Sequence, residues 1–166
     1  MYQLPIQLLD SIKNAKGFDI GAFVSVHTSG EQVTSVRLNP AKLISNPFAA
    51  GTPIPWTEFG YYLESRPSFT FDPLFHAGCY YVQEASSMFL EQALKQTVDL
   101  SKAIKVLDLS AAPGGKSTHL QSLLSKDSLL VSNEVIRSRA SILKDNIIKW
   151  GAENVMVTSN DPAHFS

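Results

Sequence analysis

The sequence predicts an α/β fold with a parallel sheet in its second half. Three short apolar segments, residues 103–110, 128–134 and 154–161, have the length and composition of buried strands. Two segments with apolar residues at helical spacing, 116–126 and 135–150, separate them. Because the links are short, right-handed crossovers should place the three strands side by side and parallel.

Both helices of this pattern have an apolar face. The first carries Leu120, Leu123 and Leu124 at helical spacing. One face of the second consists of Ile136, Ala140, Leu143 and Ile147. Gly151 follows it directly and is expected to end it, since glycine adopts the left-handed conformation at little cost.

The first hundred residues show a weaker pattern. Residues 4–15 should form an amphipathic helix, and residues 34–38 a strand. Residues 23–28 allow two interpretations, because β-branched residues favour a strand whereas Asp19 could cap a helix there. Residues 46–56 contain three prolines and should be irregular.

Residues 81–98 return to a helical pattern. Their apolar stripe would consist of Val82, Ala85, Phe89, Ala93 and Leu94. We expect the change of domain near residues 69–75, just before this helix. That places one domain over residues 1–72 and a second over residues 73–166.

Composition narrows the class of protein. With 44% hydrophobic and 17% charged residues, the 166-residue chain should form a soluble globular core. It contains no apolar run long enough for a membrane span and no signal-peptide pattern. The single cysteine, Cys79, excludes an internal disulfide and a cysteine-cluster zinc site, and it favours a cytoplasmic location. A net charge of −1 shows no excess of Lys and Arg for a nucleic-acid partner, although a local basic patch could still exist.

The turn after the first predicted strand carries the chemistry. Residues 108–120 read DLSAAPGGKSTHL, which ends like a phosphate-binding P-loop. However, Ser110 stands where that motif needs its first glycine, and Pro113 lacks the backbone N–H that a phosphate cradle uses. The dinucleotide fingerprint G-x-G-x-x-G also fails, because only Gly114 and Gly115 are present. A P-loop-like nucleotide-binding protein is therefore the less favoured alternative.

Two acidic residues follow the next strands. Glu134 lies about 20 residues past the turn, where a carboxylate can bind ribose hydroxyls. Asp161 ends the third strand. Each feature also has a purely structural interpretation. The turn could serve tight packing, and Glu134 or Asp161 could be a solvated surface acid. Arg137 and Arg139 could be charges on the surface of a helix. Together, at successive strand ends, they favour a nucleoside without phosphates, and S-adenosylmethionine has that chemistry.

These residues resemble a known family. The stretches 107–120 and 132–161, with TSVRLNPAK at 34–42 and DPLFHAGCYYVQEASSMFLEQAL at 72–94, are similar to the Sun-type (NOL/NOP/Sun) RNA 5-methylcytosine methyltransferases. Within that family, they resemble the RsmF (YebU)-like branch, which acts on bacterial ribosomal RNA. The family pattern usually has Cys where this chain has Ser110.

The resemblance implies a fold. Residues 73–166 would be the N-terminal half of a class I (Rossmann-like) methyltransferase sheet, and residues 1–72 a small α+β region of RNA-binding type. It also favours the helical interpretation of residues 23–28. In class I sheets the fourth strand pairs with the first, so residues 103–109 would be an edge strand in this chain.

The resemblance also implies a cofactor, S-adenosyl-L-methionine, and its site. Glu134 would hold the ribose hydroxyls, Asp161 would meet the adenine amino group, and Arg139 could help near the ribose. The methionine end would be wrapped by the turn residues Ser110, Ala111, Ala112, Pro113, Gly114, Gly115 and Lys116.

The implied reaction is methylation of carbon 5 of a cytosine in ribosomal RNA. That carbon is a poor nucleophile, so a Cys thiolate first adds to the neighbouring ring carbon. In the family the thiols follow the fourth and fifth strands, and this chain ends just after the third. We therefore expect no catalytic residue and no methyl transfer in the 166 residues alone. A cofactor- or RNA-binding module without catalysis is the alternative.

Other candidate residues are assigned no role. Cys79 lacks the family's Pro-Cys context and should be a buried structural thiol. His76, His119 and His164 show no metal-ligand spacing, so no metal is expected.

Overall fold

The computed structural model describes residues 4–43 and 45–165, and the chain divides into two compact units, Met1–Val33 and Thr34–Ser166. The first unit contains helices α1 (Ile6–Ile12) and α2 (Ile20–Ser29). The Asp19 carboxylate accepts a hydrogen bond from the Ala22 N–H at 2.9 Å, as an N-cap should. The helical interpretation of residues 23–28 is therefore confirmed.

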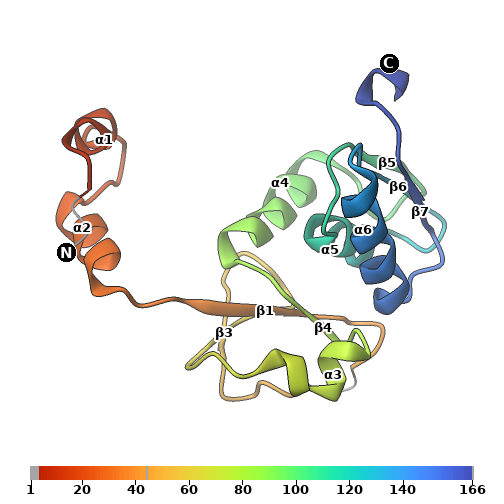
Figure 1. The fold of residues 1–166 in the computed structure, drawn as a ribbon, viewed down its shortest axis with the longest axis horizontal. Coiled ribbons are helices and arrows are strands. Elements are labelled where there is room, and N and C mark those ends of the chain that lie inside the picture. Colours follow the sequence, from red (N-terminus) through yellow and green to blue (C-terminus); the bar gives the residue numbers. More distant parts are fainter. Residues whose placement is uncertain (1–3, 44, 166) are drawn as a thin grey trace. The chain divides into compact units, whose positions relative to one another are not determined.

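The second unit begins with a four-stranded antiparallel sheet in the order β2-β3-β1-β4, seen in the lower part of Figure 1. Its strands are β1 (Thr34–Leu38), β2 (Thr52–Pro53), β3 (Gly60–Leu63) and β4 (Tyr80–Val82). Val36 and Leu38 of β1 form a core cluster with Cys79 and Tyr80. The predicted strand at 34–38 is confirmed, and residues 46–56 are irregular except for the two residues of β2.

The segment after β3 is built from short helices. They are the 3-10 helices η1 (Phe69–Phe71) and η2 (Ala85–Phe89) and the α-helices α3 (Pro73–His76) and α4 (Leu90–Thr97). The prediction of one helix over residues 81–98 is wrong at its start, because Val82 pairs with Val36 of β1 and belongs to β4. The predicted apolar stripe is also wrong, since Phe89 is 57% exposed.

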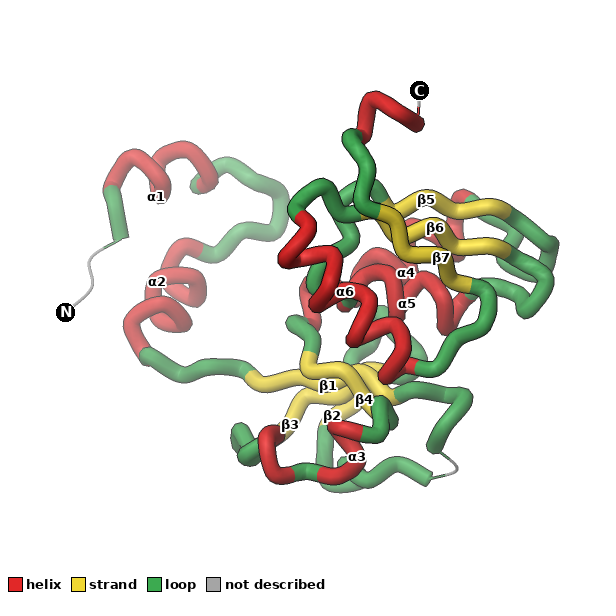
Figure 2. Tube along the Cα trace, turned by 45° about the vertical axis from the view of Figure 1, so that its right-hand side comes forward, coloured by secondary structure: helices red, strands yellow, loops and turns green. Residues whose placement is uncertain are grey.

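The parallel sheet follows, in the order β5-β6-β7, with strands β5 (Lys105–Asp108), β6 (Leu129–Asn133) and β7 (Val155–Thr158). Helices α5 (Gly115–Leu123) and α6 (Arg137–Trp150) connect them, and both lie on the same side of the sheet in Figure 2. A short 3-10 helix, η3 (Pro162–Phe165), comes last. Gly151 caps α6 with φ of 85°. The predicted α/β pattern and the end of its second helix are confirmed.

The two faces of this sheet differ. Leu130 is fully buried and lies between Val106 and Val155 in the register, on the face that α5 and α6 cover. The alternate residues Leu107, Val131 and Met156 occupy adjacent register positions on the other face. Leu107 is 41% exposed and Met156 54% exposed. Within the described residues β5 pairs only with β6, so it is an edge strand.

The predicted domain boundary between residues 72 and 73 stays a prediction. The compact units meet at residues 33 and 34, and the antiparallel sheet takes in β4 from beyond residue 73. None of the helices in residues 4–43 and 45–165 has the length and apolarity that a membrane crossing requires.

Candidate functional site

The glycine turn links the end of β5 to the start of α5. Asp108, the last residue of β5, accepts a hydrogen bond from the Ser117 hydroxyl at 2.8 Å, which ties the first turn of α5 to the strand. Gly114 has φ of 112°, a conformation that other residues rarely adopt. A Cβ at Gly114 would also lie 3.3 Å from Leu143 Cδ1. The backbone conformation therefore requires glycine at position 114, and Leu143 leaves little room for a side chain there.

A cavity of about 210 Å³ lies between this turn and the segment that contains β4. All predicted turn residues except Gly114 line it: Ser110, Ala111, Ala112, Pro113, Gly115 and Lys116. The opposite wall consists of Tyr81, Val82, Gln83, Glu84 and Ser87. A Cβ at Gly115 would lie 3.4 Å from the Tyr81 ring, in van der Waals contact with the opposite wall.

Glu134 lies beside the turn. It follows β6 directly and is 3% exposed, and its Oε1 accepts a hydrogen bond from the Ile136 N–H at 3.1 Å. Arg139 Nη1 lies 3.6 Å from Glu134 Oε2, while Arg139 Nη2 donates to the Ala112 carbonyl at 3.0 Å. Arg139 thus connects the predicted ribose-binding acid to the predicted methionine-binding turn. The roles of these residues with a cofactor stay predictions.

Asn133, which the sequence pattern did not single out, organises the strand ends. Its Nδ2 donates to the Leu109 carbonyl at 3.3 Å and to the Asn160 carbonyl at 2.9 Å. Its Oδ1 accepts from the Thr158 hydroxyl and the Asn160 N–H, both at 2.9 Å. One buried amide therefore holds the ends of all three parallel strands together. The position of an asparagine at the end of an apolar strand is the feature of the sequence that could have indicated this role.

Asp161 is exposed, and its carboxylate accepts a hydrogen bond from the Ala163 N–H at 2.9 Å in the η3 turn. Its neighbour Asn160 is held by Asn133, so Asp161 lies in the segment that follows the same set of strand ends. The structure places Asp161 one residue beyond that anchor, outside the lining of the cavity. Its predicted contact with adenine stays a prediction.

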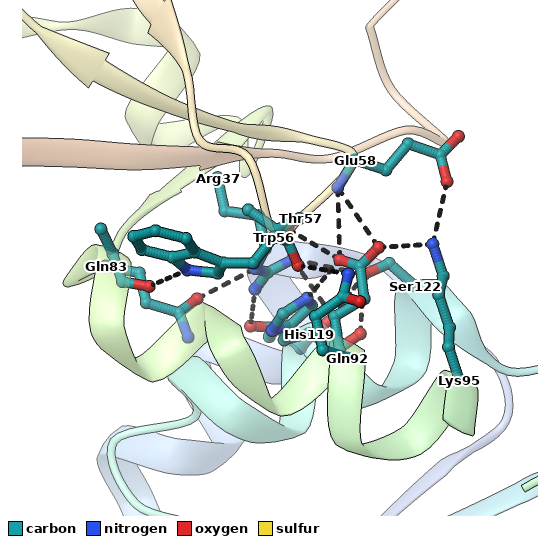
Figure 3. A network of polar contacts seen from close by, with 12 residues as sticks. Arg37, Trp56, Thr57, Glu58, Gln83, Gln92, Lys95, His119 and Ser122 are labelled. Carbon is teal, nitrogen blue, oxygen red and sulfur yellow. Dashed lines mark hydrogen bonds and ion pairs between the residues drawn. The ribbon is translucent and has the colours of Figure 1, made fainter. Parts of the chain in front are cut away.

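Behind the site, buried polar side chains form the network of Figure 3. Glu91 of α4 is 1% exposed and accepts hydrogen bonds from the Thr57 hydroxyl at 2.7 Å and from Lys95 Nζ at 2.6 Å. Burial alone would raise the pKa of Glu91, but the hydrogen bonds from Lys95, Thr57 and His119 outweigh it and lower that pKa. Glu91 is therefore a buried carboxylate that stays charged at neutral pH.

His119 of α5 contacts this carboxylate. His119 Nε2 lies 3.1 Å from Glu91 Oε2, and both side chains are 1% exposed. Burial, together with the positive charge of Arg37, lowers the pKa of His119 to about 4. The imidazole is therefore neutral at pH 7 and donates its Nε2–H to Glu91. That tautomer leaves Nδ1 as an acceptor, which has no hydrogen-bond partner among the described residues.

Arg37 of β1 joins the same network (Figure 3). It donates to Gln83 Oε1 at 2.9 Å and to Thr118 Oγ1 at 2.7 Å, and its guanidinium carbon lies 4.6 Å from the centre of the Trp150 ring. No pattern in the sequence had predicted a role for Arg37. The single arginine in the predicted strand TSVRL could have indicated this network. A charged side chain is buried only where other groups pair or hydrogen-bond with it.

Cys79 is 8% exposed and packs with Val36, Leu38 and Tyr80, so the prediction of a buried thiol is confirmed. His76 Nε2 is within hydrogen-bond distance of the Thr70 carbonyl at 2.8 Å. Across residues 4–43 and 45–165, no group of three or more His, Cys, Asp or Glu residues is arranged to hold a metal ion.

Solved structures share this fold. A methyltransferase homologue from Pyrococcus horikoshii covers 98% of this chain and 59% of its own length, with a TM-score of 0.71 and 26% identity. The structure of NSun6 from Pyrococcus horikoshii with SFG covers 58% of this chain and 24% of its own, with a TM-score of 0.51 and 28% identity. The parallel sheet with its glycine turn is thus the Rossmann-like sheet of class I methyltransferases, as predicted.

Two family models match the sequence. Residues 4–85 match the N-terminal domain of 16S rRNA methyltransferase RsmF, and residues 95–166 match 16S rRNA methyltransferase RsmB/F. Ribosomal RNA small subunit methyltransferase F of Shewanella woodyi is 35% identical over 143 residues, which is 79% of this chain and 30% of that relative. The chain belongs to the RsmB/RsmF family of 16S rRNA methyltransferases, and the predicted resemblance is confirmed. It spans about 30% of the length of this relative.

Proposed function

We propose that the chain binds S-adenosylmethionine at the carboxyl ends of β5, β6 and β7. The observation that carries this proposal is the position of Arg139, which contacts both Ala112 of the glycine turn and Glu134 after β6. The turn and the acid come from different strand ends, and one side chain holds them together. Ligands of open α/β sheets bind at this edge.

The residues present fit the cofactor. Glu134 offers a buried carboxylate, which accepts hydrogen bonds and suits the two hydroxyls of a ribose. Pro113 has no backbone N–H to give to a phosphate, and the turn lines a cavity, which suits a ligand without phosphates. When bound, the cofactor supplies an electrophilic methyl group on a sulfonium. Ser110, Ala111, Ala112, Gly115 and Lys116 would shape the space around its methionine end, and Asp161 would meet its adenine.

We propose further that the protein to which this chain belongs methylates carbon 5 of a cytosine in ribosomal RNA. The family description supports the ribosomal RNA substrate, and the resemblance to the Sun-type motif supports cytosine as the methylated base. Cys79, the chain's single cysteine, is buried in the core of the antiparallel sheet, where it cannot reach a base. The attacking thiolate would therefore come from outside these 166 residues, and the chain alone would bind cofactor without transferring a methyl group. A cytoplasmic location is part of the same proposal.

Calorimetry on the purified chain tests the cofactor proposal. S-adenosylhomocysteine should bind with one-site stoichiometry, and ATP with magnesium should give no heat beyond dilution. Binding of ATP–magnesium without any response to S-adenosylhomocysteine would favour the P-loop alternative and refute the proposal. A radiolabelled methylation assay with ribosomal RNA tests the second part, because turnover by the 166-residue chain would show that it carries its own nucleophile.

A further inference from the structure

Arg37 is a charged residue in the middle of a buried strand. All five residues of β1 are buried, and Arg37 is 1% exposed. Val36 and Leu38 face the core of the antiparallel sheet, so the alternation of side chains turns Arg37 to the opposite face, toward α5 and α6. Burial lowers the pKa of the guanidinium to about 9, and it is still charged at neutral pH. A buried charge is tolerated only where hydrogen bonds compensate for lost water.

All three nitrogens of the guanidinium donate hydrogen bonds. Nε donates to Gln83 Oε1 at 2.9 Å. Nη2 donates to Thr118 Oγ1 at 2.7 Å and to the Gly115 carbonyl at 3.3 Å. Nη1 donates to the Thr118 carbonyl at 3.4 Å and to Ser122 Oγ at 3.3 Å. Most of these acceptors belong to the first turns of α5, the helix that begins at the glycine turn.

Stabilisation of α5 does not explain this arrangement. The N-terminal turn of a helix carries partial positive charge, so a cation beside it is electrostatically unfavourable. The acceptors named above are amide, hydroxyl and carbonyl oxygens, and a carboxylate would be a stronger partner for a guanidinium. What Arg37 offers that neutral residues lack is a planar fork that can hold several acceptors in fixed directions.

The acceptors lie in both walls of the cavity beside the glycine turn. Gln83 lines one wall, and Gly115 lines the other. Thr118 extends the link, because its Oγ1 accepts from Arg37 and donates to the Gly114 carbonyl at 2.8 Å. The Arg37 guanidinium therefore connects the wall that contains Gln83 to the wall formed by the glycine turn. Arg37 itself does not line the cavity.

We propose that Arg37 is a positioning residue for the cofactor site: it fixes the separation between Gln83 and the first turn of α5 without touching the cofactor. This inference rests on the proposed binding of S-adenosylmethionine. It assigns the antiparallel sheet a part in cofactor binding, since β1 supplies the residue that holds the turn. Loss of the guanidinium's hydrogen bonds would let the two walls of the cavity move apart, which would lower the affinity for the cofactor.

Calorimetry with S-adenosylhomocysteine on the 166-residue chain tests this role. Arg37→Lys keeps the charge but replaces the fork by a point donor that cannot reach both walls. We expect its Kd to rise about tenfold, the equivalent of roughly one net hydrogen bond. Thr118→Val, which removes the hydroxyl but keeps the shape of the side chain, should shift Kd in the same direction. If circular dichroism shows that Arg37→Lys does not fold, Thr118→Val alone tests the proposal.

Asn39→Ala is the matched control. Asn39 is also 1% exposed and follows β1, but its amide donates to the carbonyls of Gly78 and Trp150, at the far end of α6. This variant should lower the urea midpoint at least as much as Arg37→Lys while leaving Kd within twofold of the parent chain. A Kd for Arg37→Lys equal to that of the parent, or an equal loss of affinity in Asn39→Ala, would overturn the positioning role. Absence of binding by the parent chain would instead refute the proposed function.

Discussion

Acidification should destabilise this protein through His119, a buried histidine among charged neighbours. Its Nε2–H donates to Glu91, while the charges of Arg37 and Lys95 oppose its protonation. Burial is the largest cause, and it lowers the folded-state pKa to about 4 from the ordinary 6.5. Since the folded-state pKa is depressed, the contribution to stability is complete above pH 6.5. It is lost as the pH falls from 6.5 toward 4, because only the unfolded chain takes up the proton.

The size of this loss follows from the two pKa values. Each pH unit between them changes the free energy of unfolding by about 1.4 kcal/mol. Going from pH 7.5 to pH 5.0 crosses roughly one and a half units of that window, which predicts a loss of about 2 kcal/mol from His119. Glu91 adds little over this range, because its pKa is lowered from 4.5 and it stays ionised at pH 5.

Urea unfolding at pH 7.5 and pH 5.0 measures the effect. Trp56 and Trp150 both lie in the second unit, so their fluorescence reports on the part of the chain that contains His119. In His119→Gln, the amide can still donate to Glu91 but cannot titrate, and most of the 2 kcal/mol loss should disappear. The exposed His27, His76 and His164 are unchanged in the variant. Equal losses in the parent chain and in His119→Gln would refute the assignment.

Three further outcomes are expected. Glu134→Ala would remove the proposed acceptors for two ribose hydroxyls, which contribute roughly 1.5–3 kcal/mol, so calorimetry should show the Kd for S-adenosylhomocysteine rise by about one to two decades. Replacement of the exposed Glu153 by Ala should leave that Kd unchanged. Cys79→Ala should leave that Kd unchanged once folding is confirmed by circular dichroism, and a lost response would place Cys79 in the site. Light scattering should show that the chain self-associates through the β5 edge and the exposed Leu107, and Leu107→Lys should reduce the association. A monodisperse monomer of the parent chain would contradict this prediction.

The parallel sheet could be predicted because its signals are local. The strands at β5, β6 and β7 are apolar runs, and Gly151 marks the end of α6 by its conformation. Gly114 likewise stands where the backbone needs a left-handed residue. Each of these features depends on a few neighbouring residues, so a pattern in the sequence is enough to find it.

The boundary between β4 and α4 could not be predicted in this way. Residues 81–98 satisfy a helical pattern, yet Tyr81 and Val82 pair with a strand more than 40 residues earlier. Here the tertiary pairing decides between two local preferences. The same holds for Asn133, whose role depends on Leu109 and Asn160, which come together only in the folded sheet.

The buried charges show why the sequence reveals the candidate site but not the residues that hold it in place. The glycine turn and Glu134 form a motif in one stretch of chain, but Arg37 lies 78 residues before Gly115, the turn residue it contacts. Arg37, Glu91 and His119 come from β1, α4 and α5, and each would be costly to bury alone. Their partners make the burial tolerable: Glu91 is held by Lys95, Thr57 and His119, and Arg37 by Gln83 and the first turns of α5. The antiparallel sheet and the glycine turn are thus joined by hydrogen bonds of defined direction and length.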